Sequence, residues 1–288
     1  QGFFGMLAAA DEAVVAALIE AAADWLRARG RKLMRGPYSL SVNQTSGLLV
    51  DGFDTPPFVL MDHNPPWLGP AVERCGLRPA KNLLAYLLDL SDGLPDRPRR
   101  LVAKDWPGLT LRKLDKRRFP EEIRTVATIF NDAWADNWGF IPLTEAEIEG
   151  MARDLKPLLD PDLVRIAELD GEPAAFIVIL PNLNEAIADL NGRLLPFGWA
   201  KLLWRLKVAG VGSARVPLMG VRRAVADTFI GKTLPLRMIY DLEARCAERG
   251  IVSVELSWLL EDNAAVIALA ESVGGRLSKT YRIYETPL

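Results

Sequence analysis

Apolar positions recur at strand and helix spacing throughout the second half of the chain. From residue 109 the pattern predicts a short strand, LTLRKL, and then two helices, the second opening TEAE, a Thr N-cap followed three residues on by Glu. The runs DLVRIAEL and AAFIVILP flank DGEP and predict a hairpin, because Asp-Gly supplies the turn. The order β-α-α-β-β-β-α-β-α-β is completed by ARVPLMGV, a helix over about 231–249, a strand over 251–258, a helix from Asn263 and the strand SKTYRIYE.

An internal repeat relates the two halves of the chain. Residues 62–86 align with residues 261–284, which sets Asn64 opposite Asn263. Upstream, each copy has an amphipathic helix that ends in Arg-Gly and leads into a strand: LIEAAADWLRARG before RKLMRGPYSL, and MIYDLEARCAERG before IVSVELSW. Matches at three successive elements in one order indicate a duplication. The alternative is that any α/β protein contains helix-Gly-strand units, since glycine suits the left-handed C-cap.

The stretch 91–108 is rich in proline and charge, as is typical of a linker. It divides the chain into two predicted α/β domains with mixed sheets, residues 1–90 and residues 109–288. The first domain opens at the strand GFFGMLA, so we expect it to be incomplete at its N-terminus, with its earlier strands missing.

The amino-acid composition excludes several classes of protein and of site. Half of the 288 residues are hydrophobic and a quarter are charged, which excludes a mainly disordered chain. The formal net charge is −2, and no nucleic-acid partner is expected. Cys75, Cys246 and the single histidine give neither a disulfide framework nor a zinc-ligand spacing, so we expect a cytoplasmic protein without a metal. Every apolar stretch long enough to span a bilayer is interrupted by charge.

The order of elements in residues 109–288 resembles the GNAT superfamily, whose members transfer an acyl group from acyl-CoA, usually to an amine. The resemblance implies a sheet in which one strand splays from its neighbour, while the next helix presents its N-terminus to the CoA pyrophosphate. The tandem arrangement, with WGFIPLT, VELSWLLEDN and KTYRIYE, is similar to bacterial ceramide synthases, which N-acylate a long-chain base. Acyl-CoA as co-substrate and a small-molecule or lipid amine as acceptor are therefore implied.

In this resemblance ARVPLMGV is the splayed strand and RRAVADTFIGKTL is the CoA loop. The family signature, Arg-x-x-Gly-x-Gly or Ala, is degraded: Gly231 stands for one glycine, but Phe229 occupies the place two residues before it. A backbone N–H near residues 219–221 would stabilise the carbonyl oxygen. The implied cofactor-binding residues are Met219, Val221, Arg222, Gly231, Lys232, Thr233 and Asn263. For Asn263, helix capping alone is the alternative.

Two residues are candidates for proton transfer. Alternation along IVSVELSW places Glu255 on a polar face of a central strand, which predicts a general base. An ion pair with a nearby arginine is an equally weighted alternative. The tyrosine that usually protonates the thiolate in this family falls at Ala270, so Tyr281 is the substitute candidate, with packing in the core as its alternative.

Three aromatic or imidazole side chains are candidates for substrate binding. Trp138 and Phe140 fall where GNAT proteins place a substrate-covering loop, and an apolar loop suits an acyl chain or a lipid. Their alternative is a place in the core. His63 lies in the proline-rich run DTPPFVLMDHNPPW, and a surface hydrogen-bonding role is its alternative.

Residues 190–226 contain seven basic side chains and no acid. Within them, residues 193–210 form a tryptophan-bearing amphipathic segment with Lys201 and Arg205 toward its other side. Such a helix lies in lipid interfaces and predicts peripheral contact at the inner face of the cytoplasmic membrane. Packing of its apolar stripe on the domain core is the alternative.

Three other functions stay open. A GNAT scaffold that has lost catalysis and binds a ligand, lipid or partner is favoured by the degraded signature and by Ala270. A tRNA-dependent aminoacyl transferase is disfavoured by the near-neutral charge. Nucleotide hydrolysis through the GKT triplet is disfavoured because Ala226 stands where a P-loop requires glycine.

Overall fold

A computed structural model describes residues 1–156 and 159–288. By contacts the chain forms two compact units: unit 1 comprises 1–86, 257–267 and 277–288, and unit 2 comprises 87–256 and 268–276. Strands β6 (Arg78–Asp89), β11 (Ser253–Leu260) and β12 (Arg276–Pro287) and helix α10 (Ala264–Ser272) have residues in both. The units interleave in sequence, whereas the predicted domains 1–90 and 109–288 are continuous, and the domain boundaries stay a prediction.

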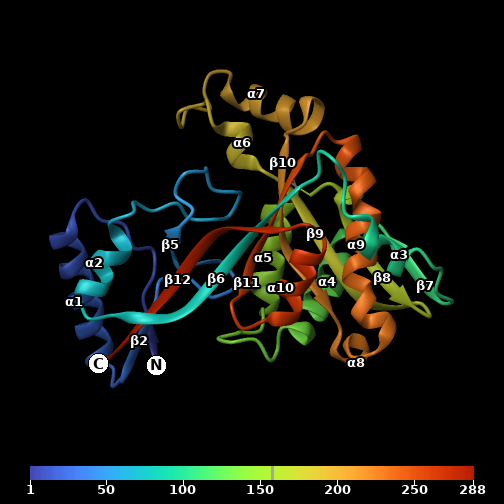
Figure 1. Cartoon of the computed structure of the whole chain (residues 1–288). Helices are drawn as coiled ribbons and strands as arrows, with labels where there is room; N and C mark the ends of the chain where they lie inside the picture. Colours follow the sequence, from blue (N-terminus) through green and yellow to red (C-terminus); the bar gives the residue numbers. More distant parts are fainter. Residues whose placement is uncertain (157–158) are drawn as a thin grey trace. The chain divides into compact units, whose positions relative to one another are not determined.

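Unit 1 combines two helices with short strands. Its other elements are β1 (Gly2–Phe3), α1 (Glu12–Arg27), β2 (Leu33–Gly36), β3 (Tyr38–Ser39), β4 (Thr45–Ser46), β5 (Leu48–Asp51) and α2 (Leu68–Arg74). Strand β2 pairs with β1 in parallel and with β12 in antiparallel orientation, β5 also pairs with β12, and β3 and β4 form a separate hairpin. Figure 1 shows α1 and α2 side by side, and their apolar faces close one core with Met34 and Tyr284.

Unit 2 follows the predicted order of elements. Its other strands are β7 (Leu109–Arg112), β8 (Val164–Leu169), β9 (Glu172–Pro181) and β10 (Ser213–Val221). Its other helices are α3 (Asp96–Val102), α4 (Phe119–Ala133), α5 (Glu145–Leu155), α6 (Leu183–Ile187), α7 (Gly198–Trp204), α8 (Arg223–Ala226) and α9 (Phe229–Glu248), with the single turns η1 (Lys116–Arg118) and η2 (Pro161–Leu163) and the π-helical η3 (Arg205–Ala209).

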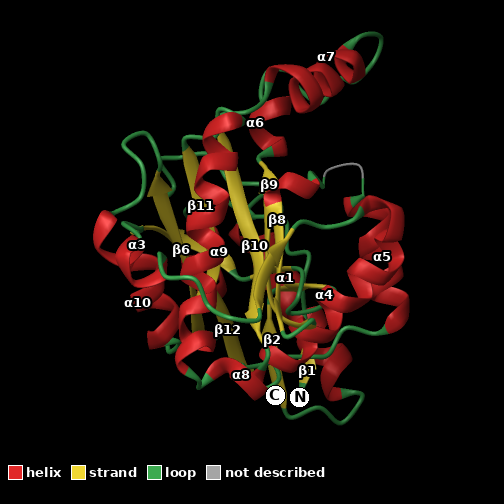
Figure 2. Ribbon diagram, turned by 90° about the vertical axis from the view of Figure 1, so that its right-hand side faces the viewer, coloured by secondary structure: helices red, strands yellow, loops and turns green. Residues whose placement is uncertain are grey.

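The sheet of unit 2 runs β11-β10-β9-β8-β7, antiparallel except for the parallel pair β10 and β11. The predicted β8–β9 hairpin is confirmed: Asp170 and Gly171 both have positive φ, 52° and 85°, as a type I′ turn requires. The capping box of Thr144 and Glu147 is also confirmed. In Figure 2, α9 covers one face of strands β8–β10, and α4 and α5 lie on the other.

Two parts of the fold differ from expectation. The strand expected at GFFGMLA is reduced to Gly2–Phe3. The stretch 91–108 is more than a linker, because it contains α3, and α9 holds it in place. The Tyr240 hydroxyl donates to the Pro95 carbonyl oxygen over 2.6 Å, and the Arg237 guanidinium donates to the carbonyl oxygens of Val102 and Lys104. Its proline and charge content is typical of a linker, whereas the hydrogen bonds that order it come from residues 133 to 145 positions away.

Between β9 and β10 the chain forms an insertion, residues 182–212, that carries α6, α7 and η3. Figure 2 shows α7 beyond the end of the sheet of unit 2. Neither α7 nor η3 contains a fully buried residue: Trp199 and Leu203 of the apolar stripe are exposed, whereas Leu202 and Leu206 are half-buried. Membrane contact of this stripe stays a prediction, and so does its alternative, packing on the domain core. Within residues 1–156 and 159–288, no helix combines the length and apolar character needed to cross a bilayer.

Candidate functional site

Strand β10 is distorted in its middle. Its register with β9 shifts by one between Arg215 and Leu218, so that Val216 and Pro217 together stand opposite Ile179. A bulge accommodates Pro217, which has no N–H to donate to a ladder. The parallel pairing of β10 with β11 runs from Ser213 opposite Ser253 to Val216 opposite Leu256. Residues 217–221 therefore extend past that ladder, which is the splayed strand that the sequence resemblance implies.

The end of β10 directs backbone N–H groups away from β9. The Arg222 N–H donates to the Ala174 carbonyl oxygen over 2.8 Å, and in an antiparallel ladder every second residue bonds to the partner strand. Met219 and Val221 are the alternate residues, so their N–H groups point to the other side of β10. The indole N–H of Trp134 donates to the Met219 carbonyl oxygen over 3.1 Å and fixes this segment to α4.

The loop expected to bind CoA is a short helix, α8, followed by the first turn of α9. Thr228 is the N-cap of α9, and its hydroxyl accepts from the Gly231 N–H over 3.1 Å. A Cβ atom on Gly231 would lie 1.8 Å from the Val225 carbonyl oxygen. Glycine is therefore required here by the contact of α8 with α9, a packing reason that does not involve phosphate.

The next two residues differ in exposure. Thr233 is buried, and its hydroxyl donates to the Ile230 carbonyl oxygen over 2.9 Å and accepts from the Arg237 guanidinium. Lys232 is exposed in the first turn of α9, which contains no acidic residue. Of the predicted GKT side chains, Lys232 is thus the one directed to solvent, and the site assignment itself stays a prediction.

Two aspartates of α4 and its C-terminal turn tie down the start of α8. The Arg223 N–H donates to the Asp132 carboxylate over 2.7 Å, and the Arg223 guanidinium bonds to Asp132 and Asp136. The guanidinium of Arg222 reaches the Pro173 carbonyl oxygen over 3.4 Å. The sequence analysis missed Asp132, Asp136 and Trp134. The signal in the sequence was the spacing of the two aspartates, four residues apart at the end of a predicted helix, which places them on one helix face.

Glu255 lies on β11 and is fully buried. The register of β10 and β11 sets it beside Arg215, whose Nε lies 3.9 Å from the Glu255 carboxylate. This is the ion pair that was the alternative to a general base. An ion pair does not exclude proton transfer by the same carboxylate, and the role of Glu255 as base stays a prediction.

Trp138 and Phe140 follow α4, and both are half-buried. The Phe140 ring meets the ring of Phe130, a core residue, with centroids 5.6 Å apart. Phe130 also contacts Trp134, so the loop is anchored through aromatic contacts to the helix that holds Met219. The role of Trp138 and Phe140 in substrate binding stays a prediction.

The remaining predicted residues lie in unit 1. Tyr281 is fully buried opposite Leu49 on β5, a setting that agrees with packing. Asn263 is confirmed as a cap, since its side-chain oxygen accepts from the Val266 N–H over 3.3 Å. His63 is exposed and lines a cavity of about 380 Å³ together with Asp62, whose pKa is raised by burial. The catalytic role of Tyr281 and the substrate role of His63 stay predictions.

No protein-family model matches the chain. Over 289 aligned residues, it is 52% identical to the bacterial ceramide synthase of Caulobacter vibrioides, and the alignment covers 100% of this chain and 75% of that protein. The chain belongs to the bacterial ceramide synthase family. Protein YghO of Escherichia coli is another relative. This chain is 47% identical to it over 287 residues, which cover 99% of this chain and 73% of that protein.

Solved structures place the family in a known fold. The chain resembles a GCN5-related N-acetyltransferase from Sphaerobacter thermophilus with a TM-score of 0.55 at 15% identity, covering 94% of this chain and 66% of that one. It resembles a tandem GNAT protein from the clavulanic acid biosynthesis pathway with a TM-score of 0.51 at 14% identity, covering 97% and 71%. The predicted tandem GNAT fold is confirmed, and so is the prediction of an acyltransferase at the level of the ceramide synthase family.

Proposed function

We propose that this chain transfers an acyl group from acyl-CoA to the amine of a hydrophobic acceptor, a sphingoid long-chain base. The name of the Caulobacter relative supports this acceptor. The observation that carries the proposal is the distorted end of β10, where the N–H groups of Met219 and Val221 turn away from β9. Aligned backbone donors of this kind stabilise the oxyanion of acyl transfer.

The reaction needs few groups. The neutral amine attacks the thioester carbonyl carbon, a C–N bond forms, and the carbonyl oxygen becomes an oxyanion near the β10 donors. When the oxyanion collapses, the C–S bond breaks and CoA leaves as a thiolate, which takes up a proton. The amine nitrogen loses a proton to a base, and we assign this role to Glu255, since it is the buried carboxylate on the strand beside β10.

The first turn of α9 would hold the phosphates of CoA. Lys232 supplies an exposed ammonium, and the positive end of the α9 dipole adds to it because no acid lies in this turn. Gly231 lets α8 approach α9, and the buried Thr233 hydroxyl bonds to the Ile230 carbonyl oxygen within the same turn, so both set its shape.

A long-chain base resides in a bilayer, so the enzyme must reach a membrane surface. We propose peripheral contact of residues 193–210 with the inner face of the cytoplasmic membrane. Support comes from the basic charge of this segment and from the apolar side chains that it leaves exposed, including Leu195, Phe197 and Trp204.

Titration calorimetry with acetyl-CoA and palmitoyl-CoA tests the proposal. We expect micromolar binding, tighter for the long chain, and about fivefold weaker for Lys232→Ala, as one phosphate contact is lost. Lys32→Ala is the matched control, an exposed lysine of unit 1. Failure of both thioesters to bind would overturn acyl transfer and favour the catalytically inactive scaffold that binds a ligand or partner.

A further inference from the structure

We propose that a cavity in unit 1 binds the ammonium and hydroxyl groups of a long-chain amino alcohol. The cavity measures about 380 Å³, and all its lining residues lie between Met6 and Leu68, within unit 1. The inference goes beyond acyl transfer, because it assigns a ligand site to unit 1, where the proposed function places none. Only the choice of a sphingoid base among such amino alcohols rests on the proposed function.

The carboxylate of this cavity belongs to Asp62. Burial raises the pKa of this carboxyl although the residue as a whole is exposed, so the carboxylate end lies against the protein. Among the residues that the structure describes, none forms an ion pair or a hydrogen bond with this carboxylate. A desolvated carboxylate favours a cation with N–H donors, and an ammonium group supplies both.

The second copy of the repeat treats the equivalent carboxylate differently. Asp62 corresponds to Glu261, whose carboxylate accepts from the backbone N–H and the side-chain amide of Asn82 over 2.9 and 2.8 Å. The protein itself thus fixes the Glu261 carboxylate, whereas it leaves that of Asp62 for a ligand.

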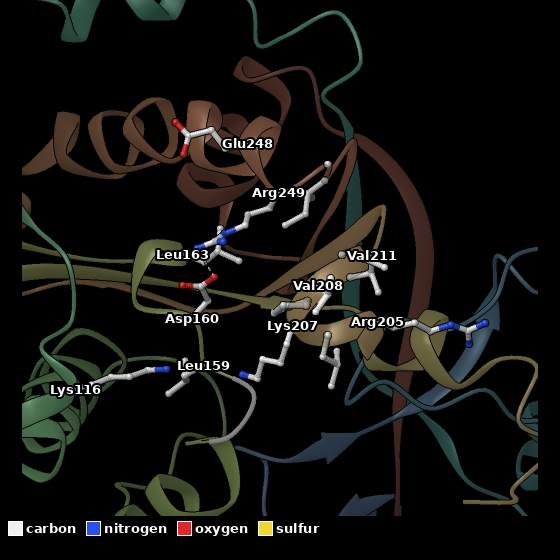
Figure 3. A pocket seen from close by; sticks show the side chains of 16 residues that line it. Lys116, Leu159, Asp160, Leu163, Arg205, Lys207, Val208, Val211, Glu248 and Arg249 are labelled. Atoms are coloured by element: carbon white, nitrogen blue, oxygen red, sulfur yellow. Dashed lines mark ion pairs between the residues drawn. The ribbon is translucent and has the colours of Figure 1, made fainter. Parts of the chain in front are cut away.

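The carboxylates that line a larger cavity, in unit 2, are also satisfied by the protein. This cavity measures about 470 Å³, and Figure 3 shows Asp160 beside Arg249 in its lining. The two side chains pair over 2.8 Å, and Glu248 pairs with Arg245 over 2.7 Å. Its acids are therefore neutralised, and of the two cavities the one in unit 1 is suited to a cationic ligand.

Two hydroxyl groups line the unit 1 cavity from the hairpin of β3 and β4. Ser39 and Thr45 are directly opposite each other in the register of this hairpin, so their side chains lie on one face of it. The other pair, Tyr38 and Ser46, alternates to the opposite face and is buried. Because a hydroxyl both donates and accepts, this face matches a ligand that carries hydroxyl groups beside its amine.

Asn64 holds the run that carries Asp62 and His63 against β5. Its side-chain oxygen accepts from the Leu49 N–H over 2.7 Å, and its amide donates to the Leu49 carbonyl oxygen over 3.1 Å. The imidazole of His63 meets the Phe53 ring edge-on, with centroids 6.3 Å apart. The polar side of the cavity is thus positioned before a ligand binds.

Leucine side chains supply the apolar side of the cavity. Leu48 of β5 and Leu68 of α2 are buried, and Met6, which also lines the cavity, is 67% exposed. Apolar walls beside a few convergent polar groups are typical of a site for an amphiphilic small molecule. A long-chain amino alcohol has this division into a polar head and an apolar chain.

The chain contains a single histidine, so the His63 imidazole gives one NMR signal that reports on this cavity. The test is titration of the untagged chain, made with isotope-labelled histidine, with a short-chain sphinganine at constant pH. We expect a saturable shift, and Asp62→Asn should weaken binding about tenfold, because a charge-assisted hydrogen bond is lost. Octylamine, which has no hydroxyl, should bind about threefold more weakly than sphinganine, and octanol about tenfold more weakly than octylamine.

Asp54→Asn is the matched control, since Asp54 is an exposed carboxylate of the same loop that does not line the cavity, and it should leave the titration unchanged. Ser39→Ala should weaken sphinganine about threefold and leave octylamine unchanged. An unmoved signal, or equal titrations of the wild type and Asp62→Asn, would overturn the site. Equal binding of octanol and octylamine would overturn the amine as ligand. Failure of acyl-CoA to bind, with a normal shift of the His63 signal, would overturn acyl transfer alone.

Discussion

Helices α1 and α9 occupy equivalent places in the two copies of the repeat, yet their N-termini differ in charge. Helix α1 is capped by Asp11, whose carboxylate accepts from the Val14 N–H over 2.9 Å, and Glu12 follows in its first turn. Helix α9 is capped by the neutral Thr228 and has Lys232 in an acid-free first turn. In both helices the N-cap side chain accepts from the N–H three residues on. In α1 the carboxylates of Asp11 and Glu12 also neutralise the positive end of the helix dipole.

The comparison shows that a duplicated fold need not reproduce the charge at a helix start. The hydrogen-bonding geometry of a helix start is reproduced by any good N-cap, while the binding of phosphate depends on the net charge that the cap leaves. On this ground we propose the start of α9, and not that of α1, for the phosphates of CoA.

The strands that follow the two helices also differ in charge, and a substitution on one of them has the largest effect on activity that we expect. At the offset of the repeat, Glu255 on β11 corresponds to Arg35 on β2, which pairs with Glu285 over 2.6 Å. We expect Glu255→Gln to lower kcat by about 10²- to 10⁴-fold, because a general base is lost while the side chain keeps its size. Steady-state kinetics over a pH range, with folding checked by circular dichroism, measures this.

Arg35→Gln is the control for Glu255→Gln, and it should leave kcat unchanged. Replacing both members of the buried pair, as in Arg215→Met with Glu255→Leu, separates the roles further, since apolar replacement of a buried pair is often tolerated in folding. An active double variant would show that Glu255 serves structure alone.

Thr228→Asp would make the start of α9 resemble that of α1. We expect acyl-CoA affinity to fall at least about tenfold, since a carboxylate then occupies the positive helix end. Thr228→Asn is the matched neutral variant and should retain affinity, because Asn is an equally good cap. Equal affinities of the two variants in calorimetry would remove α9 from the phosphate site.

Gly231→Ala tests the packing reason for glycine in this turn. The added Cβ meets the Val225 carbonyl oxygen, so α8 must move, and we expect about 1–3 kcal/mol lower stability with about tenfold weaker acyl-CoA binding. Gly150→Ala in α5 is the control, because a Cβ there meets only an Arg153 side chain at 4.0 Å. Urea denaturation and calorimetry measure the two effects, and unchanged unfolding of Gly231→Ala would contradict the contact.

Local signals in the sequence were sufficient for the order of elements and for several helix and turn ends. The Asp170-Gly171 turn and the caps at Thr144 and Asn263 were predicted and are present, because each depends on residues at most three apart. The tandem GNAT fold followed from that order together with the repeat.

Features that depend on distant contacts could not be predicted. The bond from Trp134 to Met219 joins residues 85 apart. The contact of Val225 with Gly231 is local, but it depends on the short helix α8, which the loop sequence does not indicate. Periodicity also could not show that α7 has no fully buried residue, since an amphipathic helix has the same sequence pattern whether its apolar face meets a core or remains exposed.

The smallest expected effect concerns the caps themselves. Asp11→Ala should lower the free energy of unfolding by about 1 kcal/mol, because the Val14 N–H loses its acceptor and the helix end its compensating charge. Asp11→Asn keeps the acceptor and should recover most of this loss. Neither change should alter acyl-CoA affinity, whereas Thr228→Ala should lower both stability and affinity. If Asp11→Ala weakened acyl-CoA binding as much as Thr228→Ala does, the two helix starts would not differ in function. The charge difference between them would then not explain where acyl-CoA binds.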